Sequence, residues 1–263
     1  MNQSGDQHAH AEQWAATTRC RVAAVRRFGA FTALELVAPD LAAVARPGQF
    51  VMVTVPGGVH LLRRPISLFT ARAGRLGLLV EARGAGSERL CAVEVGEALE
   101  VAGPLGTPFP TRDASGALLV GGGIGCAPLQ FLADALLDDG AQVTAAFGFR
   151  DARQARVAGA FDIERLWVAT EDGSVGRRGL VTELLAAVDA PPSTVVYSCG
   201  PVPMLAAVQR WAAADGLAGY VSLEAHMACG TGACHGCVVS TSKGYLRVCS
   251  EGPVFALDEV VMP

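Results

Sequence analysis

A glycine-rich turn between an apolar strand and an apolar helix constrains the fold of this chain more than any other feature. The segment ALLVGGGIGCAPLQFLADALLDDG, residues 117–140, reads as a buried strand, a glycine turn and a run with helical spacing. Strands and helices continue to alternate through AQVTAAFGFR, RLWVATED, LVTELLAAV and TVVYSCGPVPMLAAVQRWAAADG. Because this alternation is typical of a parallel sheet covered by helices, it predicts an α/β domain that begins near residue 111. Within this domain we expect one helix to start near Thr182.

The residues before this point follow a different rhythm. Residues 17–110 form short, nearly alternating apolar segments with glycine or proline at intervals of roughly ten residues. Such spacing predicts an antiparallel β-barrel or sandwich. We therefore divide the chain into a loose N-terminal tail, a β-barrel, an α/β parallel-sheet domain and a small cysteine-rich domain, at residues 1–16, 17–110, 111–222 and 223–263.

Composition excludes several classes of protein. The chain of 263 residues has a formal net charge of -4, so it offers no polycationic face for nucleic acid. It has no run of about 18 apolar residues that would span a membrane. Its N-terminus lacks the basic and then apolar pattern of an export signal. We therefore expect a cytoplasmic protein, whose cysteines lie in a reducing compartment where disulfides rarely persist.

The glycine turn is a candidate site for a pyrophosphate. Gly121, Gly122, Gly123 and Gly125 stand where the strand turns into the helix. Glycine lets the backbone approach a phosphate closely, and a helix N-terminus offers unpaired N–H groups. The pattern is related to the dinucleotide fingerprint without having its standard form. Packing of a tight strand–helix turn is the alternative explanation.

Two later turns also follow strand ends, where ligands of open α/β sheets bind. In VVYSCGPVPMLAAV, a helix opens at Cys199, Gly200 and Pro201. The alternative is that the cysteine only fills the core as a small buried side chain. In ATEDGSVGRRGL, Glu171 and Asp172 can hold ribose hydroxyls or can form a solvated acidic turn.

The barrel segment contains its own candidate phosphate site. Arg63 and Arg64 precede Pro-Ile-Ser67 in LLRRPISLF, and an arginine fork suits a phosphate. Gly86 and Ser87 follow in RGAGSERL, just before a short helical pattern whose N–H groups can also receive phosphate. Two surface arginines and an ordinary loop are the alternative.

The most specific pattern is the cysteine tail, which begins with HMACGTGACHGC at residues 226–237. Its spacing, C-x4-C-x2-C-x11-C, groups three thiols on one glycine-rich loop and leaves the fourth alone. Zinc sites usually pair their ligands in two short-spaced couples, and a reducing compartment disfavours disulfides. The first two gaps match the plant-type order of [2Fe–2S] proteins. The spacing therefore favours a [2Fe–2S] cluster over zinc or disulfides.

Five segments of the chain together resemble the ferredoxin–NADP reductase superfamily, in which the same motifs occur in the same order. These segments are RRPISLF, RGAGS, GGGIGCAP, YSCGPVPML and the cysteine tail. The resemblance is greatest to the electron-transfer subunits of class B dihydroorotate dehydrogenases, and it extends from about Arg19 to Val261. It implies an FAD-binding barrel, an NAD-binding α/β domain and a [2Fe–2S] domain.

The resemblance also assigns site residues. The positions that bind FAD in the family correspond here to Arg64, Pro65, Ile66, Ser67, Leu79, Val80, Glu81, Gly86 and Ser87. Those that bind NAD correspond to Gly122, Gly123, Ile124, Gly125, Cys199, Gly200 and Pro201. The cluster ligands correspond to Cys229, Cys234, Cys237 and Cys249. Ser67 is expected near the reactive edge of the flavin and Cys199 near the nicotinamide, where both orient the reactants and exclude water.

The function implied is electron transfer in pyrimidine biosynthesis. A partner catalytic subunit containing FMN would oxidise dihydroorotate, and this chain would pass the electrons through [2Fe–2S] and FAD to NAD+. No residue of this chain is evidently suited to deprotonate dihydroorotate, which places that chemistry in the partner, and a heterotetramer of two copies of each subunit is expected. The alternative is the corresponding subunit of another NAD(P)H-linked complex, of the ferredoxin:NADP oxidoreductase or sulfhydrogenase type.

Two positions leave questions open. The family usually has an arginine just before M-A-C-G, and this chain has His226, which carries a charge only part of the time near neutral pH. Arg150 and Arg153, after VTAAFGF, are able to hold the 2′-phosphate of NADP but are equally ordinary surface residues. The choice between NAD and NADP therefore stays open at this point.

Overall fold

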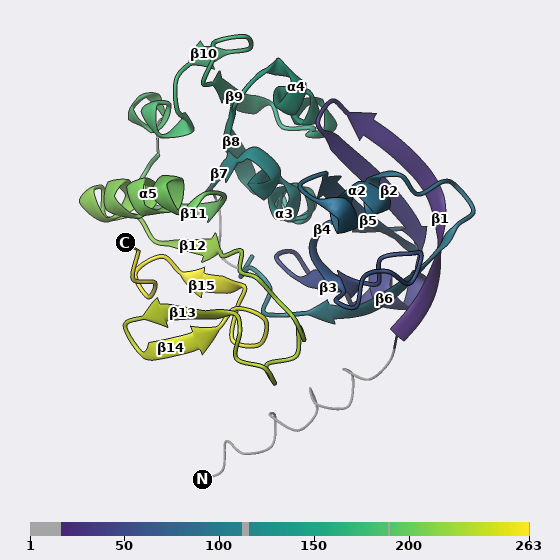
Figure 1. Ribbon diagram of the computed structural model, residues 1–263. Helices are drawn as coiled ribbons and strands as arrows, with labels where there is room; N and C mark the ends of the chain where they lie inside the picture. The colour runs from purple at the N-terminus through teal and green to yellow at the C-terminus, as the bar shows by residue number, and fades with distance from the viewer. Residues whose placement is uncertain (1–16, 112–115, 189, 263) are drawn as a thin grey trace.

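The computed structural model describes residues 17–111, 116–188 and 190–262, so the predicted N-terminal tail lies outside the described residues. Figure 1 shows a β-barrel on one side, a sheet with helices on the other, and a small C-terminal lobe below the sheet. The predicted combination of an antiparallel barrel, a parallel-sheet domain and a C-terminal cysteine-rich segment is confirmed.

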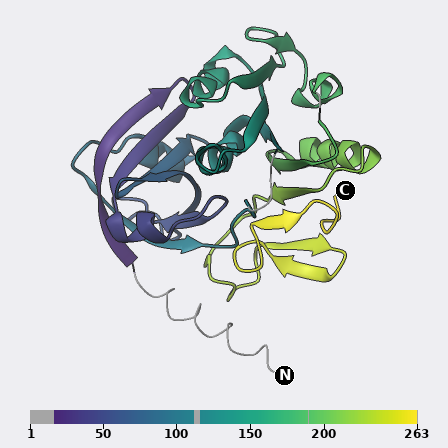
Figure 2. The same ribbon diagram turned by 180° about the vertical axis from the view of Figure 1, so that it is seen from behind.

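The barrel is closed and entirely antiparallel, in the strand order β1-β2-β5-β4-β3-β6. Its interior is filled by aliphatic side chains that alternate along the strands, among them Leu34, Leu68 and Val101. Both views show the long strand β1 on the side of the molecule farthest from helix α5 (Figures 1 and 2). The barrel elements are β1 (Thr17–Phe28), β2 (Phe31–Val37), α1 (Pro39–Val44), β3 (Phe50–Val53), β4 (Arg64–Arg72), β5 (Arg75–Glu81), α2 (Ala85–Cys91) and β6 (Ala98–Leu105).

The second domain is built on a seven-stranded sheet in the order β10-β9-β8-β7-β11-β12-β15. All pairs are parallel except the last, in which β15 runs antiparallel to β12. Its strands are β7 (Gly116–Gly122), β8 (Gln142–Phe149), β9 (Arg165–Thr170), β10 (Arg177–Arg178), β11 (Thr194–Cys199), β12 (Gly219–Ser222) and β15 (Val254–Ala256). Its helices and 3₁₀ turns are η2 (Gly123–Gly125), α3 (Cys126–Asp138), α4 (Ala152–Ala155), η3 (Arg156–Ala160), η4 (Val181–Glu183), η5 (Leu185–Ala187) and α5 (Val202–Ala214).

The two faces of this sheet bury different partners, because side chains alternate along each strand. Leu119 of β7 faces α3, and this apolar cluster continues into the barrel through Phe31 and Phe69. Leu118, the preceding residue, joins the cluster on the opposite face, where α5 packs. Helix α3 therefore lies between sheet and barrel and fixes one domain against the other.

The C-terminal segment forms a hairpin and then returns to the sheet. Strands β13 (Val238–Thr241) and β14 (Gly244–Arg247) pair antiparallel, and β15 then extends the edge of the large sheet. The cysteine-rich lobe is thus attached to the α/β domain through a strand of its own, a long-range pairing that sequence pattern did not indicate.

One predicted element is wrong. The segment LVTELLAAV was expected to form a helix, and it forms the two short 3₁₀ turns η4 and η5 instead. The apolar residues Val181, Leu184 and Leu185 that suggested helical spacing pack onto the sheet face beside α5. A following Pro191-Pro192 pair leaves little chain in which to extend a helix.

Among the described residues, no helix is both long and apolar enough to cross a membrane.

Candidate functional site

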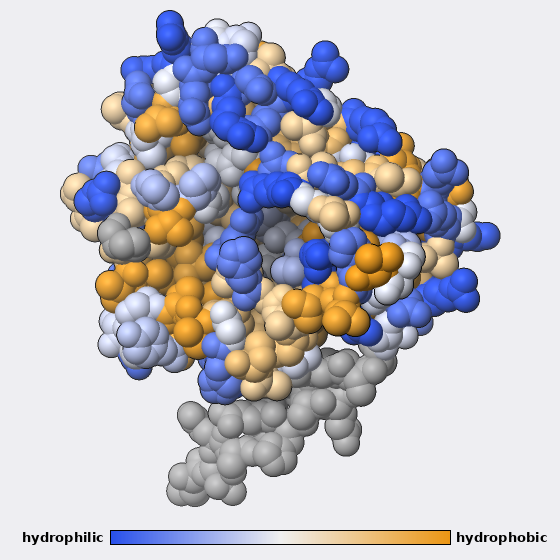
Figure 3. Space-filling view, viewed as in Figure 1, coloured by the Kyte–Doolittle hydropathy of each residue, from blue (hydrophilic) through white to orange (hydrophobic). Residues whose placement is uncertain are grey.

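Two adjoining cavities occupy the junction between the domains. The first, of about 490 Å³, opens on the barrel, and the second, of about 750 Å³, opens at the carboxyl ends of the parallel strands. Figure 3 shows a hollow near the centre of this face with hydrophobic surface beside it. The sheet places its cavity where ligands of open α/β sheets bind.

The barrel cavity gathers every residue that the family resemblance assigned to FAD. Its wall includes Arg64, Pro65, Ile66, Ser67, Leu79, Val80, Glu81, Gly86 and Ser87. These residues come from β4, β5 and the start of α2, which the barrel's register brings together. An apolar slot with an arginine and a helix start at its rim fits a ring system carrying a pyrophosphate.

Arg64 and Gly86 fit closely against each other. A Cβ on Gly86 would lie 2.6 Å from Nε and Nη2 of Arg64, so only glycine lets the guanidinium lie over the start of α2. Nη1 of Arg64 also donates to the carbonyl of Leu62 at 2.7 Å. The cation is thus held against the first turn of α2, where N–H groups have no partner within the helix, an arrangement suited to a phosphate.

Ser87 organises the loop instead of only facing a ligand. Its Oγ accepts from the backbone N–H groups of Arg83 at 2.9 Å and Gly84 at 3.1 Å. The hydroxyl therefore fixes the turn that leads from β5 into α2, and it lines the barrel cavity from there.

The glycines of the turn after β7 serve different purposes. Gly123 has a φ of 55°, and a Cβ on it would meet nothing within 4 Å, so it faces open space in the cavity of the sheet. A Cβ on Gly125 would instead collide with the backbone carbonyl of Cys199. Close packing thus explains Gly125. Gly122 and Gly123, with Ile124, line the cavity at the carboxyl ends of the parallel strands, which we call the nucleotide cavity.

Cys199 lies beneath the nucleotide cavity. Its neighbours Gly200 and Pro201 line that cavity, but the cysteine itself is 1% exposed and forms none of the wall. Burial raises the pKa of its thiol well above the usual value. A neutral, enclosed thiol is a packing group beneath the turn rather than an acid or base.

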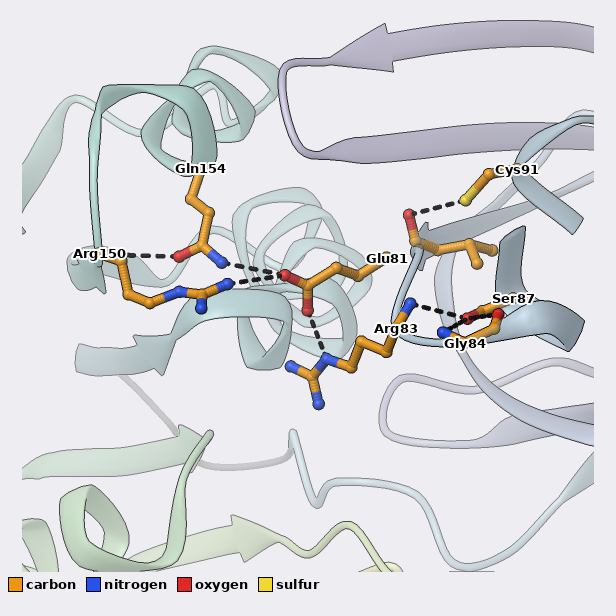
Figure 4. A network of polar contacts seen from close by, with 8 residues as sticks. Glu81, Arg83, Gly84, Ser87, Cys91, Arg150 and Gln154 are labelled. Carbon is orange, nitrogen blue, oxygen red and sulfur yellow. Dashed lines mark hydrogen bonds and ion pairs between the residues drawn. The ribbon is translucent and has the colours of Figure 1, made fainter.

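Four residues line both cavities: Glu81, Arg83, Ile124 and Glu224. The Glu81 carboxylate accepts from Nε of Arg83 at 2.6 Å and lies 3.5 Å from Nη2 of Arg150. It also accepts from Nε2 of Gln154 at 3.0 Å, so one barrel carboxylate joins the two domains (Figure 4).

Glu224 is exposed where it lines both cavities. Desolvation of its carboxyl by the surrounding protein nevertheless raises its pKa, and the nearby charge of Arg83 lowers it in part. Glu224 belongs to the segment 223–227, which lines the barrel cavity and leads directly to the cysteine loop.

The cysteine loop directs backbone N–H groups at its sulfurs. The N–H of Thr231 lies 3.4 Å from Sγ of Cys229, and the N–H of Gly236 lies 3.4 Å from Sγ of Cys234. The N–H of Gly232 approaches Sγ of Cys249 at 3.1 Å. Such donors stabilise thiolates and tune the potential of a cluster that they hold.

The thiols differ in environment. Cys237 and Cys249 are buried, Cys229 is half-buried and Cys234 is exposed. Burial raises the pKa of Cys229, but hydrogen bonds from Thr231 and Cys234 outweigh this and lower it to about 6. Burial and the contact with Cys237 raise the pKa of Cys249 to about 12.

In the described part of the chain, no group of three or more histidine, cysteine, aspartate or glutamate side chains is arranged to hold a single metal ion. The fit to an iron–sulfur cluster rests on the N–H···S contacts of the cysteine loop.

Several residues at the junction of the domains were not assigned to a site from the sequence. Glu224 and His60 line the barrel cavity without belonging to a motif. Arg83 lines it as well and is the first residue of RGAGS, but the motif assigned it no role. Gln154 was missed because its contact with Glu81 joins positions 73 residues apart. His226, noted only as a departure from the family pattern, proves to line the barrel cavity beside Met227.

The fold and the site define a class, a reductase of the ferredoxin–NADP reductase type with a C-terminal iron–sulfur domain. A solved structure of an NADH-dependent reduced ferredoxin-NADP oxidoreductase shares 26% identity at a TM-score of 0.79, covering 94% of this chain and 91% of that one. Phthalate dioxygenase reductase, at 17% identity and a TM-score of 0.63, covers 89% of this chain and 94% of its own, and shows the fold alone.

The sequence comparisons are more specific. Residues 224–261 match the model of the iron-sulfur cluster binding domain of dihydroorotate dehydrogenase B. The electron transfer subunit of dihydroorotate dehydrogenase B (NAD(+)) from Shouchella clausii is 39% identical over 230 residues, covering 83% of this chain and 88% of that protein. The same subunit from Caldanaerobacter subterraneus is 39% identical over 224 residues, covering 82% of this chain and 87% of that protein. The chain belongs to the family of dihydroorotate dehydrogenase B electron transfer subunits.

Family and fold together support the three predicted cofactors, FAD, NAD and a [2Fe–2S] cluster. The resemblance found in the motifs is thereby confirmed.

Proposed function

We propose that electrons cross this subunit in one direction, from the cysteine loop through the barrel cavity to the nucleotide cavity. The named relatives are NAD(+)-linked electron transfer subunits of dihydroorotate dehydrogenase B. The chain accordingly delivers to NAD+ the electrons that a catalytic partner subunit takes from dihydroorotate, in pyrimidine biosynthesis.

One observation carries the route: the barrel cavity touches both of its neighbours. It shares Glu81, Arg83, Ile124 and Glu224 with the nucleotide cavity, and the segment 223–227, which leads to Cys229, also lines it. When bound, the cluster supplies single-electron transfer, and FAD supplies the exchange of a hydride with NAD.

The chain's own residues hold and enclose these groups. Arg64 and the start of α2 receive the FAD pyrophosphate, and Ser67, in the cavity wall, orients the flavin edge. Gly122 and Gly123 let the backbone approach NAD. Cys199 acts through packing beneath Gly200, and Ile124 keeps water from the junction. Cys229, Cys234, Cys237 and Cys249 ligate the cluster.

A partner subunit would dock beside the exposed Cys234. The loop between β3 and β4 carries Val59 and Leu61, which are 83% and 98% exposed, and its His60 reaches the barrel cavity. Tyr245 of the β13–β14 hairpin is 80% exposed. Exposed apolar side chains suit a stable protein interface. The partner is proposed to contain FMN and to form a heterotetramer with two copies of each subunit.

We place this complex in the cytoplasm. The four proposed ligands, Cys229, Cys234, Cys237 and Cys249, are free thiols in the structure, and a reducing compartment keeps them available to the cluster.

The test is co-expression with a dihydroorotate dehydrogenase catalytic subunit, followed by anaerobic purification. The complex should contain iron, acid-labile sulfide and FAD, and should reduce NAD+ with dihydroorotate. A Cys249→Ser variant should lose this activity with its iron. Zinc in place of iron and sulfide, or reduction of NAD+ only with reduced ferredoxin as donor, would refute the assignment.

A further inference from the structure

The Glu81 carboxylate is a fixed negative charge between the domains. It ends strand β5 of the barrel, and its side chain is 8% exposed, whereas those of Arg83 and Arg150 are 63% and 70% exposed. Figure 4 shows Glu81 between Arg83 on one side and Arg150 with Gln154 on the other.

Gln154 holds this carboxylate in position. Its Nε2 donates to Oε1 of Glu81 at 3.0 Å, while its Oε1 accepts from the backbone N–H of Arg150 at 3.1 Å. Asp151 in turn accepts from the backbone N–H of Gln154 at 2.9 Å and caps α4. The amide is buried and each end is engaged, so its orientation is set.

In the part of its wall that the structure describes, the nucleotide cavity has no arginine or lysine that lacks a carboxylate partner. Its two arginines, Arg83 and Arg150, both pair with Glu81. Its other charged lining groups are the carboxylates Glu171 and Glu224. NADP differs from NAD by a 2′-phosphate that needs an available arginine, whereas NAD offers hydroxyls that a carboxylate can accept.

We propose that Glu81, contributed by the barrel, sets the dinucleotide specificity of the neighbouring domain by withholding Arg150 from a 2′-phosphate. Glu171, which follows β9 and lies in the same cavity, then accepts the ribose hydroxyls of NAD. The proposal rests on the proposed function, because it concerns the same nucleotide cavity. It explains how a chain with an arginine after β8 can belong to an NAD-linked family.

Binding of nucleotide fragments to the full chain tests the proposal without measuring turnover. Calorimetry would compare 5′-AMP with 2′,5′-ADP, which differ in the 2′-phosphate. Wild-type protein should not prefer 2′,5′-ADP. Glu81→Gln should bind 2′,5′-ADP roughly five- to twentyfold more tightly, with 5′-AMP affected much less. Glu35→Gln, which removes a barrel carboxylate paired with Arg75 outside both cavities, is the matched control and should change neither affinity.

A double variant identifies the cation involved. Glu81→Gln combined with Arg150→Ala should lose the gain for 2′,5′-ADP. FAD content and the melting temperature of each variant report whether the barrel is intact, and Glu81→Ser should repeat the result if the glutamine variant loses its flavin.

The proposal is overturned if neither Glu81 variant gains affinity for 2′,5′-ADP, or if the gain persists without Arg150. If either of these results is found while the complex still reduces NAD+ with dihydroorotate, only this proposal fails and the proposed function stands. Failure of every variant to bind either fragment would overturn this proposal and the proposed function together, because the cavity would then not be a nucleotide site.

Discussion

Gly230 of the cysteine loop lies directly against Met52 of barrel strand β3. A Cβ on Gly230 would stand 2.6 Å from Cγ of Met52, and Gly230 has a φ of 70°. The cysteine loop is therefore seated on the barrel itself. Phe50 of the same strand lines the barrel cavity, so this contact holds the cysteine loop against a strand that forms the cavity wall.

Gly230→Ala should lower iron content and slow electron transfer from cluster to flavin. The positive φ alone should cost about 1–2 kcal/mol, and the new methyl group would also push the loop away from Met52. Gly244→Ala is the matched control, because Gly244 has a φ of 105° with nothing within 4 Å of an added Cβ. Iron analysis should show a loss only for Gly230→Ala, and equal losses would mean that strain alone matters.

Gly86→Ala should weaken FAD binding roughly tenfold or more, because an added methyl group displaces the guanidinium of Arg64 from the start of α2. Gly159→Ala is the control, because nothing lies within 4 Å of a Cβ added to Gly159 and it lines neither cavity. Titration of the flavin-free protein with FAD measures the affinity of each variant. A comparable loss of FAD affinity in Gly159→Ala would contradict the assigned role of Arg64.

Tyr197 makes the protein sensitive to alkaline pH. Its hydroxyl donates to the carbonyl of Pro110 at 2.8 Å, and burial raises its pKa from 10.0 to about 12. Below pH 10 the neutral hydroxyl contributes its full stability, and between pH 10 and 12 the unfolded state loses its proton first, so the contribution is lost. The wild-type free energy of unfolding should fall by up to about 2 kcal/mol more over this range than that of Tyr197→Phe.

Urea unfolding at a series of pH values measures this difference. Tyr245→Phe, at an 80% exposed position, should follow the wild-type pH profile. An identical pH profile for Tyr197→Phe would show that the buried hydroxyl does not titrate as described.

Leu61→Asp should weaken assembly with the catalytic subunit without affecting the fold, since its side chain is 98% exposed. A charge placed in an apolar interface should weaken binding about tenfold or more. Val95→Asp, at another exposed apolar position outside both cavities, is the control. Analytical ultracentrifugation of mixed subunits measures the effect, and unimpaired assembly of Leu61→Asp would move the interface elsewhere.

The features that the sequence predicted well are those encoded locally. Cys229, Cys234 and Cys237 lie on one loop, and Arg64 to Ser67 form one strand segment, so spacing and motif order revealed them. Glu81 and Arg150 could not be paired in advance, because they are 69 residues apart and meet only through the docking of α3 between the domains. The helix expected near Thr182 failed because apolar spacing alone does not distinguish a helix from 3₁₀ turns packed on a sheet.

Position 226 shows the limit of motif reading in another way. The departure at His226 was evident in the sequence, but its place in the wall of the barrel cavity depends on the fold of segment 223–227. His60, which lines the same cavity, comes from a loop of the barrel that no motif marked.

The most direct measurement follows the cluster by electron paramagnetic resonance in the anaerobic complex with the catalytic subunit. Addition of dihydroorotate without NAD+ should produce the signal of the reduced cluster, and subsequent NAD+ should abolish it as NADH forms. Formation of NADH while the cluster stays oxidised, or at an undiminished rate in a Cys234→Ser variant without iron, would contradict transfer through the cysteine loop.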